Sequence, residues 1–233
     1  MSIKTLAIVP AGGSGRRMGA DKPKQYLSLA GRPILVHTMR ALHASPAIAE
    51  IYLVTPSDDM TYAETLLNQE GPFEKITRII AGGPTRQDSA RNGILASRDE
   101  HGILLIHDGV RPFITADLIG RVIRAAALEG AAIAAVPVRE TVKKLGEDHR
   151  LTTINREDLW LAQTPQAFRR DIIWKAHEDA LKNGILATDD AALVERMGIA
   201  VKLVPGAYDN IKITTPEDLA LAELLVKKGK KCG

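Results

Sequence analysis

The sequence predicts an α/β protein, built on a doubly wound and mostly parallel sheet with a protruding β-hairpin arm. Three observations support this fold class. Short apolar runs alternate along the chain with segments whose apolar residues recur at helical spacing. Several runs, such as Ile103–Ile106, are apolar throughout, as in parallel strands that are buried on both faces. The alternation stops at Arg139–Asn155, a polar stretch interrupted by Gly-Glu-Asp, which is typical of a hairpin.

The expected elements follow in order from Thr5–Val9, a short buried strand. Further strands are expected at Ile51–Val54, Ile76–Ile80, Ile103–Ile106, Ala131–Val136 and Val201–Val204. Helices are expected at Ile34–His43, Asp58–Asn68, Gln87–Ala96, Thr115–Leu128, Asp171–Lys182 and Asp189–Met197. Thr115, Thr188 and Thr215 are placed as N-caps, and Pro216 at the first position of a final helix is typical of a helix start. This succession indicates a Rossmann-like arrangement.

The composition bounds the domain organisation. At 233 residues the chain is long enough for one large α/β domain or at most two small ones. Apolar residues make up 45% of it, which supports a substantial core. Because no linker marks a boundary, we expect one domain over residues 1–233, with the arm at about 138–156.

The composition also disfavours several kinds of partner. The net charge is +3 and aromatic residues make up 4%, with no basic stripe interleaved with aromatics, so nucleic-acid binding is not expected. No segment approaches the roughly 20 apolar residues of a membrane helix, and we expect a cytoplasmic protein that binds no membrane. The one cysteine, Cys232, excludes an internal disulfide and a thiolate metal cluster.

The loop from Val9 to Lys24 carries the strongest functional signal. It contains three glycines, Gly12, Gly13 and Gly15, and four cations, Arg16, Arg17, Lys22 and Lys24. Bare backbone N–H groups can surround phosphate oxygens, and the cations can neutralise charge that builds up during a reaction. The dinucleotide fingerprint fails because Met18 stands where its last glycine is needed, and the P-loop pattern is absent. The sequence therefore predicts nucleotide chemistry of another kind.

Polar clusters also follow other strands of the expected sheet, at the edge where α/β proteins bind ligands. His107–Pro112 follows one strand directly, and Asp209–Lys212 lies between the last strand and the final helix. Asp108 is suited to bind Mg²⁺ beside a triphosphate. The alternative is that its carboxylate caps a helix or pairs with Arg111. The cluster Gly82–Ser89 could wall a nucleobase, but the residues alone favour a simple turn and helix start. His107 is expected to be a strand-end residue satisfied by hydrogen bonds, since the histidines lack metal-binding spacing.

With these clusters in place, the chain resembles the 2-C-methyl-D-erythritol 4-phosphate cytidylyltransferases, CTP-using enzymes of the non-mevalonate isoprenoid pathway. The resemblance runs nearly end to end. Its motifs are PAGGSGRRM…PKQY (10–26), GGPTRQDS (82–89), HDGVRP (107–112), PVRETVK (137–143), NREDLWLAQTPQAF (155–168), TDDAALVE (188–195) and DNIKITTPEDL (209–219). The first motif alone marks only the wider nucleotidyltransferase group, whereas several of them in this order are specific to the family.

The resemblance implies a role for each matched residue. Arg17 and Lys24 would stabilise the transition state at the α-phosphate of CTP, and Arg156 and Lys212 would position the incoming sugar phosphate. The acceptor pocket would be lined by Thr141, Arg111 and Thr164. Asp108 would lie near Mg²⁺ and the substrate. The cytidine site would be formed by Ala11, Gly12, Gly13, Gly83 and Ser89, and Gly15 is also expected to bind the nucleotide. The arm resembles the family's dimerisation arm, which implies a homodimer in which Thr141 reaches the neighbouring subunit's site.

Two residues depart from the family pattern, and other functions stay open. Pro84 stands where relatives often carry an acidic residue near the base, so a contact that bears on base selectivity is lost. Gly109 replaces a common alanine, a small change that should be tolerated. The nearest alternative is a cytidylyltransferase for another polyol phosphate, such as ribitol 5-phosphate. A non-catalytic nucleotide-binding module is disfavoured by the full set of cations, and a glycosyltransferase by the lack of a D-x-D tripeptide.

Overall fold

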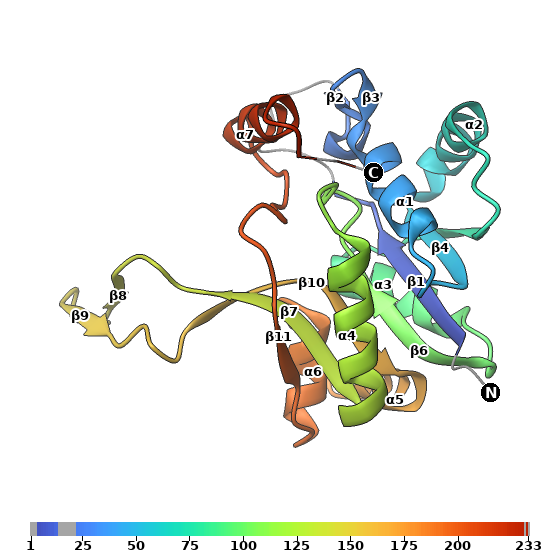
Figure 1. Ribbon diagram of the computed structural model, residues 1–233. Helices are drawn as coiled ribbons and strands as arrows, with labels where there is room; N and C mark the ends of the chain where they lie inside the picture. Colours follow the sequence, from blue (N-terminus) through green and yellow to red (C-terminus); the bar gives the residue numbers. More distant parts are fainter. Residues whose placement is uncertain (1–3, 14–21, 231, 233) are drawn as a thin grey trace.

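A seven-stranded sheet forms the centre of the computed structural model, which describes residues 4–13, 22–230 and 232 (Figure 1). The strand order is β11-β7-β10-β6-β1-β4-β5. The strands are β1 (Lys4–Pro10), β4 (Glu50–Thr55), β5 (Ile76–Ala81), β6 (His101–Ile106), β7 (Ala131–Pro137), β10 (Trp160–Arg169) and β11 (Lys202–Pro205). Six of these were predicted, with ends that agree to within two residues. The predicted α/β class with a mostly parallel sheet is confirmed.

The seventh strand, β10, was not predicted. It inserts between β6 and β7 and pairs with both in the antiparallel sense. Its sequence combines exposed residues at one end with buried ones at the other, so it shows neither clean alternation nor a continuous apolar run. Its pairing with β7 is irregular between Ala162 and Gln166. This irregularity lies next to the pocket described below.

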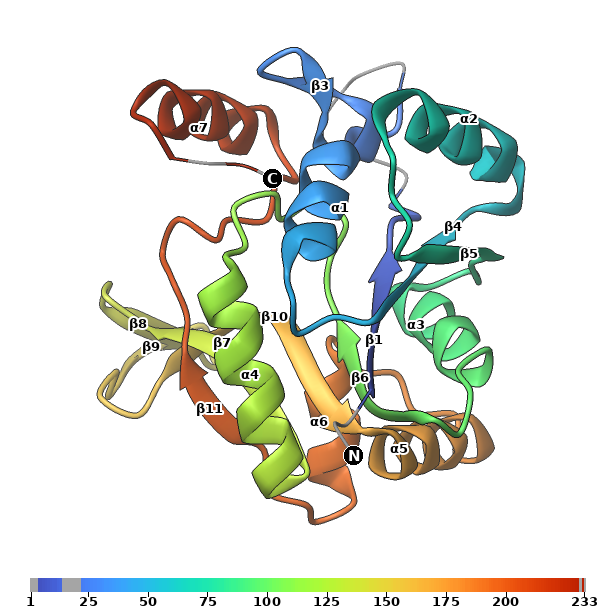
Figure 2. The same ribbon diagram turned by 45° about the vertical axis from the view of Figure 1, so that its right-hand side comes forward.

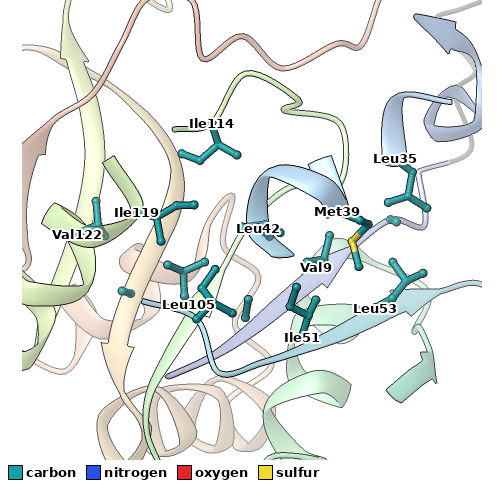
Figure 3. Close-up of a cluster of buried hydrophobic side chains, with 14 of the residues drawn as sticks. Val9, Leu35, Met39, Leu42, Ile51, Leu53, Leu105, Ile114, Ile119 and Val122 are labelled. Atoms are coloured by element: carbon teal, nitrogen blue, oxygen red, sulfur yellow. The ribbon is translucent and has the colours of Figure 1, made fainter. Parts of the chain in front are cut away.

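Two layers of helices cover the sheet, because residues of each strand alternate between its faces. In β1, Ala7 and Val9 belong to one core cluster and Leu6 and Ile8 to the other. The first cluster takes its helical residues from α1 (Ile34–Ala44), α2 (Met60–Glu70) and α4 (Ala116–Glu129), the helices labelled in Figure 2. Figure 3 shows side chains of this cluster from α1 and α4, among them Met39 and Ile119. The second takes them from α3 (Arg86–Leu95), α5 (Arg170–Lys182) and α6 (Asp190–Arg196).

A third apolar cluster holds the segment around Lys212 against the rest of the molecule. It joins α7 (Pro216–Lys227) to the small two-stranded sheet of β2 (Ser28–Leu29) and β3 (Arg32–Pro33), with Leu29, Val110 and Ile213 among its buried members. Two short 3₁₀ helices, η2 (Lys24–Tyr26) and η3 (Ser57–Asp59), precede β2 and α2; Gln25 and Tyr26 of η2 are buried, whereas η3 has no buried residue. Through this cluster, the segment around Lys24 and the one around Lys212 lie on the same side of the molecule.

The polar stretch after β7 forms a separate two-stranded antiparallel sheet. Its strands are β8 (Val142–Leu145) and β9 (Leu151–Ile154). Figure 1 shows this hairpin extending away from the seven-stranded sheet. Its side chains are exposed or half-buried, including Leu145 and Leu151.

The helix starts are mostly as predicted. Thr115 and Thr215 both accept a hydrogen bond from the third residue of their helices, and Thr215 forms a full capping box with Asp218. The prediction that Thr188 caps α6 was wrong. Asp189 is the cap, and its side chain accepts from the N–H of Ala192. An aspartate caps as well as a threonine does, so the sequence did not distinguish two adjacent candidates.

Candidate active site

A cavity of about 480 Å³ opens beyond the carboxyl ends of β1, β5 and β6. Its walls come from four segments that are far apart in the sequence. The lining residues are Pro10, Ala11, Gly12, Gly13, Lys24, Gln25, Gly83, Pro84, Thr85, Arg86, Ser89, Asp108, Val110 and Lys212. The structure therefore brings together the glycine-rich loop, the 82–89 cluster, Asp108 and Lys212. This edge of the sheet is where α/β proteins bind ligands.

Asp108 lies at the centre of a group of cations. Its Oδ1 accepts from Nε of Arg86 at 3.0 Å. Its Oδ2 contacts Nε of Arg111 at 3.2 Å and Nζ of Lys212 at 3.1 Å. Burial alone would raise the pKa of Asp108, but the charges of Arg86, Lys212 and Arg111 together hold it well below its usual range. Asp108 is therefore a permanent carboxylate whose charge is more than balanced by its neighbours.

Arg86 was not predicted as a functional residue. It stands at the start of α3, and its guanidinium joins Asp108 to Asp190 of α6, with Nη1 of Arg86 2.8 Å from Oδ2 of Asp190. Asp190 is fully buried and also contacts Nε2 of His177 at 3.1 Å. The motif GGPTRQDS contained Arg86, but its partners lie 22 and 104 residues away, so no local signal marked it.

Lys24 lies directly against the glycine-rich loop. A Cβ added at Gly13 would lie 2.8 Å from Cε and 3.2 Å from Nζ of Lys24. A Cβ added at Gly12 would instead lie 4.0 Å from Oγ of Ser89. The loop therefore runs from a Ser89 end of the pocket to a Lys24 end. The absence of a side chain at Gly13 is what allows the Lys24 ammonium to approach the backbone.

The Ser89 end of the pocket combines a buried hydroxyl with backbone amides. Oγ of Ser89 accepts from the N–H of Gly83 at 3.2 Å and donates to the carbonyl of Thr85 at 3.0 Å. Thr85 and Asp88 form a capping box at the start of α3. The helix prediction at this cluster is thus confirmed, and its first residues also face the pocket.

Arg111 and Thr164, both expected to line the acceptor pocket, are buried behind Asp108 rather than on the cavity wall. Thr164 accepts from the N–H of Asp108 at 3.0 Å. Arg111 donates from Nη1 to the carbonyl of Asn210 at 2.7 Å, which holds the segment leading to Lys212. In this single chain, these two residues position Asp108 and Lys212.

His107 is satisfied by hydrogen bonds at the strand end, as predicted. Its Nδ1 lies 3.1 Å from Oγ1 of Thr164, and its Nε2 lies 3.2 Å from the carbonyl of Arg111. Since a carbonyl only accepts, Nε2 carries the proton, and Nδ1 accepts from Thr164. Complete burial is the main reason that the pKa of His107 falls to about 4. The imidazole is therefore neutral around pH 7.

Thr141 and Arg156, two residues expected to bind the acceptor, lie outside the pocket of the single chain. Both are exposed, Thr141 just before β8 and Arg156 between β9 and β10. Arg156 donates to the carbonyl of Arg139 at the base of the hairpin. The remaining two predicted residues, Arg17 and Gly15, lie outside the described residues.

The pocket offers one carboxylate that could hold a divalent cation together with a polyphosphate. Asp108 is the one carboxylate among the described residues that line it. Mg²⁺ is typically bound by one or two carboxylates together with phosphate oxygens. Oδ1 of Asp108 faces a single cation, Arg86, whereas Oδ2 faces two. Oδ1 is therefore the atom better suited to a metal ion.

Comparisons against known proteins show which family the chain belongs to. The model of the family described as 2-C-methyl-D-erythritol 4-phosphate cytidylyltransferase (IspD) matches residues 5–228. The chain belongs to this family. A relative from Syntrophus aciditrophicus named 2-C-methyl-D-erythritol 4-phosphate cytidylyltransferase is 52% identical over 229 residues, 98% of each chain. A relative from Pelotomaculum thermopropionicum with the same name is 49% identical, over 96% of this chain and 94% of the other.

Solved structures give the same result. The structure of 4-diphosphocytidyl-2C-methyl-D-erythritol synthase from Anaerococcus prevotii superposes with a TM-score of 0.86 at 34% identity, covering 97% of this chain and 96% of the other. The resemblance stated from the motifs is therefore confirmed, and the chain is a nucleotidyltransferase of the α/β class. None of the helices in the described ranges is long and apolar enough to cross a membrane.

Proposed function

We propose that this enzyme transfers CMP from CTP to 2-C-methyl-D-erythritol 4-phosphate. The products are 4-diphosphocytidyl-2-C-methyl-D-erythritol and pyrophosphate, in the non-mevalonate route to isoprenoid precursors. The observation that carries the proposal is the cavity in which Arg86 and Lys212 contact Asp108 while Lys24 lines the wall against the glycine-rich loop, in a chain of this family.

The chemistry is an in-line displacement. An oxygen of the acceptor's 4-phosphate attacks the α-phosphorus of CTP, the bond from that phosphorus to the α,β-bridging oxygen breaks, and pyrophosphate leaves with the electron pair. This step needs positioning and cationic stabilisation rather than a covalent intermediate. Lys24, with Arg17, would balance the charge that builds up on the α-phosphate. Lys212, held by Asp108, would position the acceptor phosphate together with Arg156.

The nucleotide would occupy the pocket from its Ser89 end toward its Lys24 end. Gly83 and Ser89 would line the cytosine-binding part of the pocket. The backbone from Ala11 to Gly13, continuing to Gly15, would surround the phosphates. The closeness of Gly12 to Ser89 and of Gly13 to Lys24 supports this order. Pro84 also lines the pocket and offers no side-chain donor or acceptor to the base.

We further propose Mg²⁺ as the divalent cation, held by Asp108 and by phosphate oxygens of CTP. When bound, it neutralises phosphate charge and orients the triphosphate. Chelation should abolish pyrophosphate release, and added Mg²⁺ should restore it. Full activity in the presence of excess chelator would contradict this assignment.

The acceptor half of the site would be completed by a second copy of the chain. Thr141 and Arg156 lie at the hairpin, away from the cavity of their own chain, and Leu145 and Leu151 of the hairpin are 59% and 67% exposed. A homodimer through the arm at about 138–156 would cover these side chains and carry Thr141 to the neighbouring site. Arg111 and Thr164 would form the floor beneath the acceptor. Sedimentation that shows a monomer at assay concentrations would refute the dimer.

The proposal extends to the whole chain as one nucleotidyltransferase domain, residues 1–233, acting in the cytoplasm. One assay tests the reaction: pyrophosphate release with Mg²⁺, CTP and 2-C-methyl-D-erythritol 4-phosphate, compared with ribitol 5-phosphate as acceptor and with ATP, GTP and UTP as donors. We expect turnover to require CTP and the methylerythritol phosphate. If pyrophosphate is released with ribitol 5-phosphate and not with the methylerythritol phosphate, the proposed acceptor is wrong and the proposed nucleotide chemistry stands.

A further inference from the structure

Gln25 is a buried pocket residue whose side-chain amide is unpaired in the part of the chain that the structure describes. It lies in η2 directly after Lys24, lines the cavity, and is 1% exposed. Neither its amide nitrogen Nε2 nor its amide oxygen Oε1 has a hydrogen-bond partner among the described residues. A buried amide left unpaired in this way destabilises the empty protein, because both groups have lost their bonds to water. A pocket residue that is unpaired in the empty protein is available to a ligand.

The position of Gln25 is fixed by its neighbours. Tyr26, the next residue, is buried, packs edge-on against Tyr62 with ring centroids 4.8 Å apart, and has its hydroxyl 3.4 Å from Oγ1 of Thr55. On the other side, Lys24 lies against Gly13. The carboxamide is therefore held at the Lys24 end of the cavity, where the phosphates and the acceptor would meet, and not at the Ser89 end proposed for the base.

The chemistry of the unpaired group restricts its ligand. A carboxamide offers two N–H donors and one acceptor oxygen. A phosphate oxygen only accepts, so it would leave Oε1 unpaired, and an ammonium or guanidinium only donates, so it would leave Nε2 unpaired. A hydroxyl group both donates and accepts, and vicinal hydroxyls can satisfy both amide atoms together.

We propose that Gln25 binds a hydroxyl group of the substrates, either on the ribose of the nucleotide or on the polyol acceptor. The inference rests on the proposed function and adds a residue to that site. A bond made in a water-excluded position contributes strongly to recognition, because a substrate that lacks the hydroxyl leaves the amide unpaired again.

The test combines stability with kinetics. Gln25→Met removes both amide groups and nearly preserves side-chain volume, so we expect its Tm without ligand to equal or exceed the wild-type Tm. We expect its kcat/KM to fall on the order of 10- to 100-fold, the range that one lost hydrogen bond to a buried partner produces. Gln25→Glu, which keeps an acceptor and loses the donor, serves as a second variant and should also lose activity.

Tyr52→Phe is the matched control. The hydroxyl of Tyr52 is likewise buried and has no hydrogen-bond partner within the described ranges, but it lies in β4 in the core beneath α3, outside the cavity. Its removal should also leave Tm unchanged or higher, whereas kcat and both KM values should stay within about 2-fold of wild type, because a surface or core change away from the site carries no transition-state contact.

Two arms identify the source of the hydroxyl. If it belongs to the ribose, calorimetry should show weaker CTP binding to Gln25→Met, and wild-type protein should bind 2′-deoxy-CTP or 3′-deoxy-CTP equally weakly. If it belongs to the polyol, CTP affinity should be unchanged and KM for the acceptor should rise. Wild-type values in both arms overturn the inference. A Tm of Gln25→Met well below wild type also overturns it, since the amide would then stabilise the empty protein.

The proposed function is tested separately by turnover of the wild-type enzyme. If wild-type protein releases no pyrophosphate with methylerythritol phosphate, the proposed function fails, and the role of Gln25 is then decided by the CTP-affinity arm alone.

Discussion

Asp108 in the pocket and Asp190 on α6 are linked through one guanidinium, that of Arg86. Both carboxylates are buried, at 5% and 1% exposure, and Arg86 contacts them at 3.0 and 2.8 Å. Asp190 in turn contacts His177 of α5. The carboxylate that holds Lys212 is therefore connected to α5 and α6. This connection makes Arg86 important for stability as well as for the pocket.

Arg86→Ala should strongly destabilise the protein. It would leave Asp190 with His177 alone and Asp108 without one of its three cations, and breaking a buried ion pair typically lowers the free energy of unfolding by about 3–5 kcal/mol. Urea unfolding measures the change. Arg150→Ala is the control, since its pair with Asp148 lies in the exposed hairpin and should contribute less than about 1 kcal/mol. Equal losses in the two variants would contradict the prediction.

Lys24→Ala should lower kcat by on the order of 10²- to 10³-fold, the usual effect of removing one charge-stabilising group from an active site. The fold should stay intact, because Lys24 lies at the cavity and not in a core cluster. Pyrophosphate release and circular dichroism measure the two properties. Lys182→Ala, at an exposed position of α5 outside the cavity lining, is the control and should keep normal turnover. Near-normal turnover of Lys24→Ala would show that Lys24 does not stabilise the transition state.

Gly13→Ala should reduce activity more than Gly12→Ala does. The new methyl at 13 would lie 2.8 Å from Cε of Lys24, so the flexible lysine must move away. At Gly12 the nearest atom, Cδ of Pro56, would be at 3.5 Å, an ordinary contact. Displacement of a catalytic group by about 1 Å can reduce the rate by about 10²-fold. Steady-state kinetics of both variants, with Tm as a control for folding, checks the difference, and equal effects would rule out this explanation.

Stability should fall as the pH drops from about 6.5 to about 4, with a contribution from His107. Its pKa lies near 4 in the folded protein and near 6.5 in a free histidine, mainly because of burial, so the folded state binds fewer protons in this range. The contribution is complete above pH 6.5 and is lost toward pH 4. Protonation of Nδ1 would end its acceptance from Thr164, which holds the backbone of Asp108.

The measurement for His107 is urea unfolding at several pH values. The difference between wild type and His107→Gln should change across this window by up to about 3 kcal/mol, the equivalent of the pKa shift. Glutamine can both donate and accept hydrogen bonds, as the neutral imidazole does, but it does not titrate. A difference that is constant between pH 7 and pH 4 would show that His107 does not contribute to the pH dependence.

Local patterns were enough for most of the fold and for the positions of the site. Apolar runs placed six of the seven sheet strands, and the glycine-rich loop, Asp108 and Lys212 were identified from their places after strands. Strand β10 was missed because its mixed burial gives no simple period. Arg86 and Gln25 were missed because their importance depends on what surrounds them. Arg86 pairs with Asp190, 104 residues away, and the unpaired amide of Gln25 is evident only from its burial.

The sequence by itself determined the α/β class and the family, because both depend on patterns of residues close together in the chain. It also predicted phosphate binding by the glycine-rich loop. The tertiary structure decided which residues share the cavity and which support it. Insertion of β10 beside β6 carries Thr164 to the backbone of Asp108, and the hairpin carries Thr141 away from the pocket of its own chain. These placements depend on pairing between distant segments, whose partners local periodicity does not specify.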